Sequence, residues 1–396
     1  MEKINPTLEK TLSYMTYGSL MILALGLVTS TTLLALSHIL IIVPAIYFLT
    51  RADYKNYSKS AWALLAMTFI IIISVLVNQD IAINGYKPIF KAKYFLFGFL
   101  AIAPFSWYFK NNLNKRKISW LLYAFFIATT FATIVGIYSK YSLFNPVTLR
   151  NVSKDRNAGL FGMVMNYAHN MAYFQIIITS LVFYRKEIQK YINSYFLYII
   201  FAINSMGLYL TYTRGAWLGF LVGIPFLFFK NNKKWFATII VALAILGIVV
   251  YSVAGKNVIR PQSDQERLSQ WQAAIMAFKE RPVFGYGYLN FEQHSVEIKK
   301  RYNIGQIQFG GHAHSNVFEM LGSTGALGLI AFFFWITLWF LEMYKRTDVI
   351  AKTALPFIVV FFVSGLTQST ISLGINLFFI MAAYSITQIN IRNIKN

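Results

Sequence analysis

Long apolar runs recur along the whole chain and constrain its fold more than any other feature. They contain roughly 16 to 21 residues each, against the roughly 20 that an α-helix needs to cross a bilayer. The runs lie near residues 14–30, 32–50, 61–77, 94–109, 118–138, 159–184, 194–212, 215–229, 235–254, 315–341, 353–370 and 371–388. Charged residues make up only 13% of the sequence, against about 25% in soluble domains. We therefore predict an all-α polytopic membrane protein, with about twelve transmembrane helices in a single membrane domain, residues 1–396.

Basic residues indicate the orientation of these spans. Short clusters of Lys and Arg occupy alternate connections, near residues 51–59, 110–117, 185–190, 230–234 and 345–352. The positive-inside rule places these connections and both termini in the cytoplasm. The opposite side then receives a segment of sixty residues, 255–314, which we predict to be one large exported loop containing helices.

The formal net charge of +22 is high for a chain with so few charged residues. In a soluble protein such a charge could indicate nucleic-acid binding, but here the basic groups flank apolar spans. This arrangement favours anionic lipids or pyrophosphate as partners over nucleic acid. The chain has no cysteine, which excludes disulfides, thiolate metal sites and thiol nucleophiles.

The exported loop opens with the sequence Ser-Asp-Gln-Glu at residues 263–266, which fits a capping box. Apolar residues then follow at helical spacing, at Leu268, Trp271, Ile275 and Phe278. This pattern predicts an amphipathic helix from Ser263 to about Lys279, which Pro282 ends. The glycines after Pro282 predict a turn that approaches a neighbour or a ligand closely.

Two histidines, His312 and His314, end the loop just before a helix expected to start near Ser315. The positive end of that helix should lower the pKa of a nearby histidine. A neutral imidazole can take a proton from a hydroxyl group, as a general base for glycosyl transfer must. The alternatives are an imidazole that lies at the lipid headgroups and a zinc ligand, although a catalytic zinc site usually needs a third protein ligand.

Several arginines are candidates for binding a phosphate. Arg214 falls at the outer turn between two spans, where its guanidinium could hold a phosphate in a bidentate manner. Arg267 projects from the predicted amphipathic helix, and Arg281 and Arg156 lie in other exported segments. The alternatives are a snorkelling arginine for Arg214 and a solvated helix face for Arg267.

Other residues in or near the spans are secondary candidates for a functional or a packing role. Glu319, His169 and Asp80 are ionisable groups inside or beside spans, which indicates either a functional site or a buried hydrogen-bonded pair. Three glycines, Gly322, Gly325 and Gly328, are expected to let helices pack closely.

Taken in order, these residues resemble the O-antigen ligase and polymerase superfamily of bacterial inner-membrane glycan enzymes. The resemblance is carried by residues 156–161, 213–217, Arg267 with Trp271, 282–287 with Phe291, and 312–316 followed by Gly322 and Gly325. It covers roughly residues 156–328, and the first half of the chain adds only the number of spans. Ser315 departs from the pattern, because asparagine is common at this position in the family.

The resemblance implies a fold similar to that of GT-C glycosyltransferases, with the active site facing the periplasm. It implies an inverting, metal-independent transfer of a glycan from undecaprenyl pyrophosphate to a sugar hydroxyl of the lipid A–core oligosaccharide, with no cofactor. In this interpretation His314 is the general base and His312 supports it. Arg214 and Arg267 would bind the pyrophosphate of the donor, with Arg156 and Arg281 as auxiliary residues.

Three other activities fit the same sequence features. An O-antigen polymerase would use a second lipid-linked glycan as the acceptor, and an O-linked protein glycosyltransferase of the same superfamily would use a protein. A flippase or another transporter of lipid-linked oligosaccharides would also need many spans and basic cavity residues.

Overall fold

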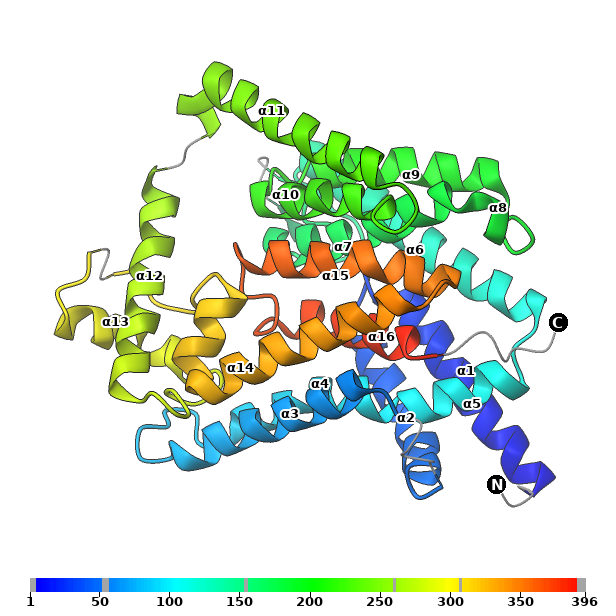
Figure 1. Ribbon diagram of the computed structural model, residues 1–396, viewed down its shortest axis with the longest axis horizontal. Helices are drawn as coiled ribbons and strands as arrows, with labels where there is room; N and C mark the ends of the chain where they lie inside the picture. Colours follow the sequence, from blue (N-terminus) through cyan, green and yellow to red (C-terminus); the bar gives the residue numbers. More distant parts are fainter. Residues whose placement is uncertain (1–4, 52–56, 153–155, 259–260, 306–307, 390–396) are drawn as a thin grey trace.

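The computed structural model describes residues 5–51, 57–152, 156–258, 261–305 and 308–389, and these residues are mostly helical (Figure 1). The helices of the first half are α1 (Pro6–Gly26), α2 (Thr31–Leu49), α3 (Lys59–Val77), η2 (Lys87–Ala92), α4 (Lys93–Leu100), α5 (Ile102–Asn111) and α6 (Lys115–Ser142). Those of the second half are α7 (Val164–Phe183), α8 (Arg185–Ile188), α9 (Ser194–Tyr209), α10 (Arg214–Gly223), η3 (Ile224–Leu227), α11 (Lys233–Val258), α12 (Pro261–Glu280), α13 (Phe291–Arg301), α14 (Asn316–Lys345), α15 (Val349–Gly365) and α16 (Gly374–Thr387). A short antiparallel pair of strands, β1 (Phe144–Asn145) and β2 (Arg150–Asn151), follows α6.

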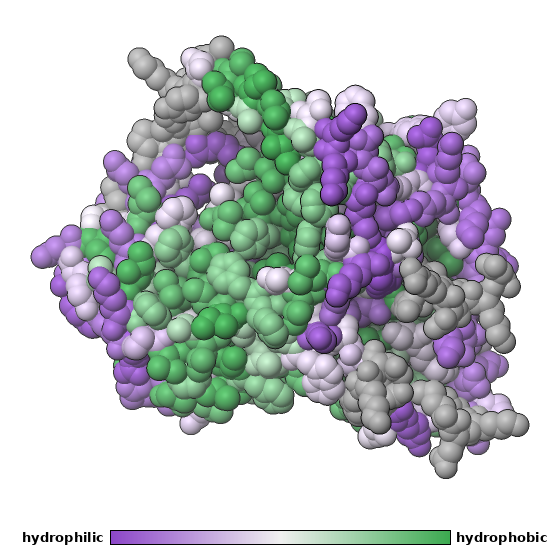
Figure 2. Space-filling view, in the orientation of Figure 1, coloured by the Kyte–Doolittle hydropathy of each residue, from purple (hydrophilic) through white to green (hydrophobic). Residues whose placement is uncertain are grey.

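The described helices have the length and composition of membrane spans. Five of the described segments are long and apolar enough to cross a bilayer, and four shorter apolar helices accompany them. Figure 2 shows apolar side chains gathered over the middle of the bundle, with hydrophilic residues towards both ends. The predicted all-α polytopic class is therefore confirmed, while the number of about twelve spans remains a prediction.

Local sequence explains where several helices begin. The side chains of Asn5, Ser58, Asn114, Asn193 and Asp348 each accept a hydrogen bond from a backbone N–H in the first turn of the helix that follows. Such N-caps satisfy donors that have no partner within the helix. They set where α1, α3, α6, α9 and α15 start.

Helices α12 and α13, from the loop predicted to be exported, stand together at one end of the bundle (Figure 1). The predicted amphipathic helix is present, but the predicted capping box is wrong. Helix α12 begins at Pro261, two residues before Ser263, so Ser263 lies inside the helix. Proline is favoured in the first turn because its fixed φ suits a helix and its missing N–H would have no partner there.

The turn after α12 packs against α14 at Gly325, where the helical backbone of α14 is interrupted. Gly325 has φ 64° and ψ −160°, which interrupts the helical backbone. The N–H of Tyr286 donates to the carbonyl of Gly322 at 2.9 Å, and the N–H of Ala326 donates to the carbonyl of Pro282 at 2.8 Å. A Cβ atom on Gly325 would lie 2.5 Å from the Val283 carbonyl oxygen. The close approach predicted for the turn after Pro282 is therefore confirmed, and Gly325 accommodates this turn instead of a neighbouring helix. The contact joins the end of α12 to α14.

Replacing Gly325 by alanine is expected to lower the free energy of unfolding by about 2–5 kcal/mol, because the new Cβ meets both a backbone conformation reserved for glycine and a carbonyl oxygen. Thermal unfolding of the purified protein in detergent would measure the change. The matched control is Gly247→Ala in α11, where an added Cβ has nothing within 4 Å. Equal melting temperatures for the two variants would contradict this account of the break.

Candidate active site

Gln368 joins the two histidines. It lies between α15 and α16 and is 2% exposed. Its Oε1 accepts a hydrogen bond from Nδ1 of His314 at 2.9 Å, and its Nε2 donates to Nε2 of His312 at 3.2 Å. The two imidazole rings lie 4.4 Å apart, centroid to centroid. Because Nδ1 of His314 carries the proton in this arrangement, its Nε2 has the lone pair that a base requires.

Asn316 fixes the loop that carries Gln368. This buried residue is the first of α14, and its Oδ1 accepts from the backbone N–H of Ile371 at 3.1 Å. Its Nδ2 donates to Oγ1 of Thr370 at 3.0 Å. At the other side of the same loop, Gly365 packs so closely that a Cβ there would lie 2.2 Å from the Asn316 amide nitrogen. The start of α14 and the loop after α15 therefore fix the positions of His314 and Gln368 relative to each other.

Glu319 supports the backbone between the histidines. It is fully buried in the first turn of α14. Its carboxylate accepts the backbone N–H of Ala313 at 2.7 Å and the hydroxyl of Ser323 at 2.9 Å. A carboxylate in this position satisfies a backbone donor and suits the positive end of the helix. Among the secondary candidates, Glu319 therefore lies beside the histidines as a positioning residue.

Burial lowers the pKa of both histidines. For His314 burial is the leading cause, and the positive charges of Arg267 and Lys299 act in the same direction, while the hydrogen bond that His314 donates to Gln368 and the charge of Glu266 oppose it. Burial, together with His314, lowers the pKa of His312 to about 4. The predicted lowering is confirmed, but its main cause is desolvation and not the helix dipole that the sequence indicated.

Arg214 and Arg267 converge on one carboxylate. Arg214 begins α10 and Arg267 lies on α12. Nη2 of Arg214 lies 3.1 Å from Oδ1 of Asp264, and Nη1 of Arg267 lies 3.8 Å from the same oxygen. Arg267 is also near enough to His314 to influence its pKa, which burial chiefly lowers. Two guanidinium groups that meet at one oxygen, beside a neutral histidine, can bind an anion next to a base.

Arg156 contacts the turn that carries Arg214. Its Nε donates to the carbonyl of Thr211 at 2.8 Å, and its Nη2 donates to Oγ1 of Thr213 at 2.8 Å and to the carbonyl of Tyr212 at 3.3 Å. Thr213 is the N-cap residue of α10. Arg156 therefore stabilises the turn that precedes Arg214.

Arg281 lies in a different set of contacts. Its Nη1 donates to Oδ1 of Asn78 at 2.7 Å, and its guanidinium pairs with both carboxylate oxygens of Asp80. These bonds connect the end of α12 to the segment after α3. His169, the third of the secondary candidates, is fully buried in α7, and neither of its ring nitrogens has a hydrogen-bond partner within the described part of the chain.

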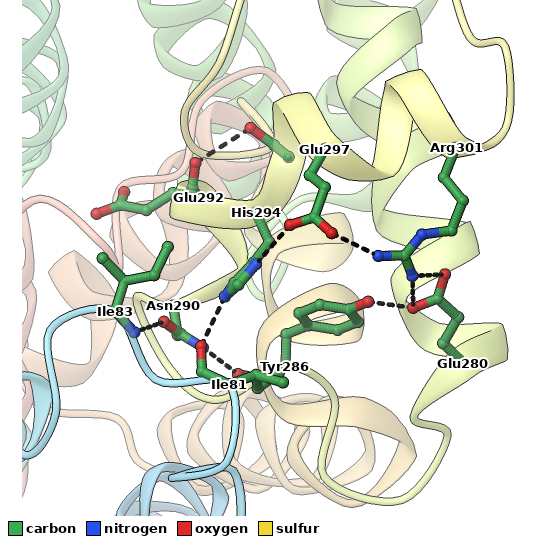
Figure 3. A network of polar contacts seen from close by, with 10 residues as sticks. Ile81, Ile83, Glu280, Tyr286, Asn290, Glu292, His294, Glu297 and Arg301 are labelled. Carbon is green, nitrogen blue, oxygen red and sulfur yellow. Dashed lines mark hydrogen bonds and ion pairs between the residues drawn. The ribbon is translucent and has the colours of Figure 1, made fainter.

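Polar contacts tie α13 to its surroundings (Figure 3). Arg301 pairs with Glu280 of α12 at 2.8 Å and with Glu297, one turn earlier on α13, at 2.7 Å. Nε2 of His294 lies 2.7 Å from the carbonyl oxygen of Ile81, in the segment after α3. Helices α12 and α13 are therefore held to each other and to the neighbouring connection, which supports the loop that carries the histidines.

Lys299 of α13 is a site residue that sequence reasoning missed. It is fully buried, and its ammonium donates to the carbonyl of Phe309 at 2.5 Å. Gln270 of α12 donates to the same carbonyl at 2.9 Å, and the N–H of Gly311 donates to Oγ of Ser295 at 2.9 Å. Helices α12 and α13 thus hold the segment that leads into the histidines. In the sequence Lys299 stands in a basic run that is typical of a solvated helix face.

Comparison with known proteins places this arrangement in a family. The sequence model of a family described as O-Antigen ligase matches residues 199–333, the stretch from α9 to α14 that contains Arg214, Arg267, His312 and His314. This segment matches the O-antigen ligase family. The predicted superfamily is confirmed. An uncharacterized protein of Haemophilus influenzae is 26% identical over 323 residues, which cover 74% of this chain and 75% of that protein.

The two histidines lie apart from any cluster of metal-ligand side chains among the described residues. In the parts of the chain that the structure describes, no set of three or more His, Cys, Asp or Glu side chains could hold one. His312 and His314 instead share Gln368.

If His314 acts as the base, replacing Gln368 by leucine is expected to reduce the activity of the protein by up to about 100-fold, because a displacement of about 1 Å at a catalytic group can cost that much. Leucine can neither accept a hydrogen bond from Nδ1 of His314 nor donate one to His312. Gln368→Glu keeps the acceptor and should retain more activity. Steady-state rates, with thermal unfolding as a check on folding, would measure both variants, and equal losses would contradict the orienting role.

Replacing Lys299 by methionine is expected to shift the acidic limb of the pH–rate profile to higher pH. Removing this buried cation makes His314 easier to protonate, so its pKa rises and the neutral base is lost at a higher pH. The matched control is Lys300→Met, because Lys300 is the exposed neighbour on α13. The same shift in both variants, or none in either, would contradict this role for Lys299.

Proposed function

We propose that this protein is an O-antigen ligase, which transfers a glycan from undecaprenyl pyrophosphate to a sugar hydroxyl of the lipid A–core oligosaccharide on the periplasmic face of the bacterial inner membrane. The observation that carries the proposal is the convergence of Arg214 and Arg267 on one carboxylate oxygen, that of Asp264, with Arg267 close enough to affect His314. A pyrophosphate leaving group needs cations, and an acceptor hydroxyl needs a base.

In the proposed reaction the acceptor hydroxyl gives its proton to Nε2 of His314. The acceptor oxygen forms a bond to the anomeric carbon of the glycan from the face opposite the phosphate. The bond from this carbon to the phosphate oxygen breaks, and its electron pair leaves with the lipid diphosphate. Direct displacement inverts the anomeric carbon, and His312 and Gln368 keep His314 in the required tautomer.

Arg214 and Arg267 neutralise the charge that develops on the leaving diphosphate. Because guanidinium groups supply this charge, the proposed reaction needs no divalent ion. The contacts of Arg156 support a role in positioning Arg214. Those of Arg281 support a role in joining α12 to the segment after α3, so both act indirectly in the proposal.

An assay with two different acceptors distinguishes a ligase from a polymerase and from a transporter. Full-length protein in nanodiscs would receive one lipid-linked donor, with either lipid A–core or a second lipid-linked glycan as the acceptor. A ligase yields a larger glycolipid only with lipid A–core. A longer lipid-linked glycan would instead identify a polymerase. Failure to consume the donor with either acceptor would contradict the proposed transfer and favour a transporter.

A further inference from the structure

Asp264 occupies the point at which the two arginines meet. One of its carboxylate oxygens lies 3.1 Å from Nη2 of Arg214 and 3.8 Å from Nη1 of Arg267. Asp264 and Arg267 lie one turn apart on α12, while Arg214 comes from α10. All three side chains keep some solvent exposure, 41% for Asp264, 30% for Arg214 and 25% for Arg267. An external anion that reaches these guanidinium groups therefore competes with a carboxylate of the protein itself.

In the proposed reaction this competition matters after transfer, when the diphosphate product has to leave the two arginines. In the donor the diphosphate is esterified at both ends and carries two negative charges. Transfer leaves the electron pair of the broken bond on the terminal phosphate, which then has a second ionisable oxygen and gains further negative charge at neutral pH, since the second pKa of such a group is about 6. The product thus attracts cations more strongly than the substrate does. Arginines without a competitor would bind the leaving group more tightly than the donor.

We propose that Asp264 promotes release of the lipid diphosphate product by competing with it for Arg214 and Arg267. This inference rests on the proposed function. The carboxylate gives up its contacts with the two guanidinium groups when the diphosphate binds and makes them again as the product leaves, so it acts on turnover and not on bond cleavage. Because Asp264 is on the same helix as Arg267, the exchange requires rotation of side chains and no movement of α12.

A purely structural role for the same ion pair makes a different prediction. Exposed ion pairs contribute little to stability, so an Asp264 that only braced α12 would leave the affinity for a diphosphate unchanged when it is replaced. If Asp264 competes, its neutral isostere should bind the diphosphate more tightly. The two roles are therefore separated by a binding measurement that does not depend on catalysis.

The test uses full-length Asp264→Asn protein in nanodiscs, with Asp264→Ala as a second variant and Asp264→Glu to restore the charge. The dissociation constant of undecaprenyl diphosphate is expected to fall by about tenfold or more in the Asn and Ala variants, since a factor of ten corresponds to only about 1.4 kcal/mol of charge interaction. In the transfer assay both should show a burst of one product per enzyme followed by slow turnover.

The matched control is Glu297→Gln, which removes another ion-paired acid from the exported helices, one that contacts Arg301 and His294. Unchanged or weaker binding of undecaprenyl diphosphate by Asp264→Asn would overturn the inference, as would an equal gain in the control. If wild-type protein forms no glycolipid with any acceptor, the proposed function fails instead. The binding comparison still decides whether Asp264 competes with a diphosphate for the two arginines.

Discussion

Replacing His314 by alanine is expected to reduce glycosyl transfer by roughly 10²- to 10⁴-fold, which is the usual contribution of a general base. Binding of the lipid-linked donor should be retained, because Arg214 and Arg267 are unchanged. Initial rates and donor dissociation constants, measured on the same nanodisc preparation, would separate the two effects. Alanine leaves Gln368 without its partner at Nδ1, so thermal unfolding has to accompany the rates.

The matched control for this variant is His294→Ala. His294 lies on α13, but it contacts Ile81 and Glu297 in place of Gln368. Because it contacts neither His314 nor the two arginines, its loss should leave the rate of transfer close to that of wild type. Wild-type turnover after loss of His314 would contradict the general-base role.

The pH dependence follows from the same residue. Burial lowers the pKa of His314 below its ordinary value of 6.5, and the base must be neutral to accept a proton. The rate should therefore fall only as the pH drops through this lowered pKa, at a more acidic pH than a solvated histidine would give.

Replacing Arg214 by alanine is expected to lower kcat by roughly 10²- to 10³-fold, the cost of removing one donor that stabilises charge in the transition state. In this variant the diphosphate would still contact Arg267 but would lose its contact with Arg214, the residue on α10. Arg214→Lys should recover only part of the rate, because an ammonium lacks the planar fork that holds a phosphate in a bidentate manner. Steady-state kinetics with a lipid-linked donor would give kcat and KM for each variant.

Arg301→Ala provides the matched control, because Arg301 is an exported arginine that pairs with Glu280 and Glu297. It should change the rate little. A loss confined to KM in Arg214→Ala would show that Arg214 binds the donor without stabilising the transition state. Full activity in this variant would remove Arg214 from the reaction.

The periodic parts of the fold could be predicted from the sequence because a membrane span is a local property. Apolar length located most of the helices, and helical spacing located α12. Boundaries were less accurate where polar residues belong to loops that are buried by tertiary contacts. The predicted spans at residues 353–370 and 371–388 are in fact α15, which ends at Gly365, and α16, which begins at Gly374. The intervening loop carries Gln368.

The site was predictable only in part, for a physical reason. The histidines and arginines stand out because charged or ionisable residues are costly near a membrane. Gln368 and Lys299 act through contacts with segments distant in the sequence or through burial, so nothing in their local sequence marks them. Asp264 was interpreted as part of a capping box, and its position between two arginines depends on how α10 meets α12.

The central claim is that the site formed by His314, Arg214 and Arg267 transfers a glycan from a lipid diphosphate without a metal ion. The most direct measurement is transfer of a labelled glycan to lipid A–core by purified protein in proteoliposomes, in the presence of a metal chelator. The account predicts a labelled glycolipid from wild-type protein and a loss of at least about 100-fold in the His314→Ala variant. Transfer that stops with the chelator, or that continues without His314, would contradict it.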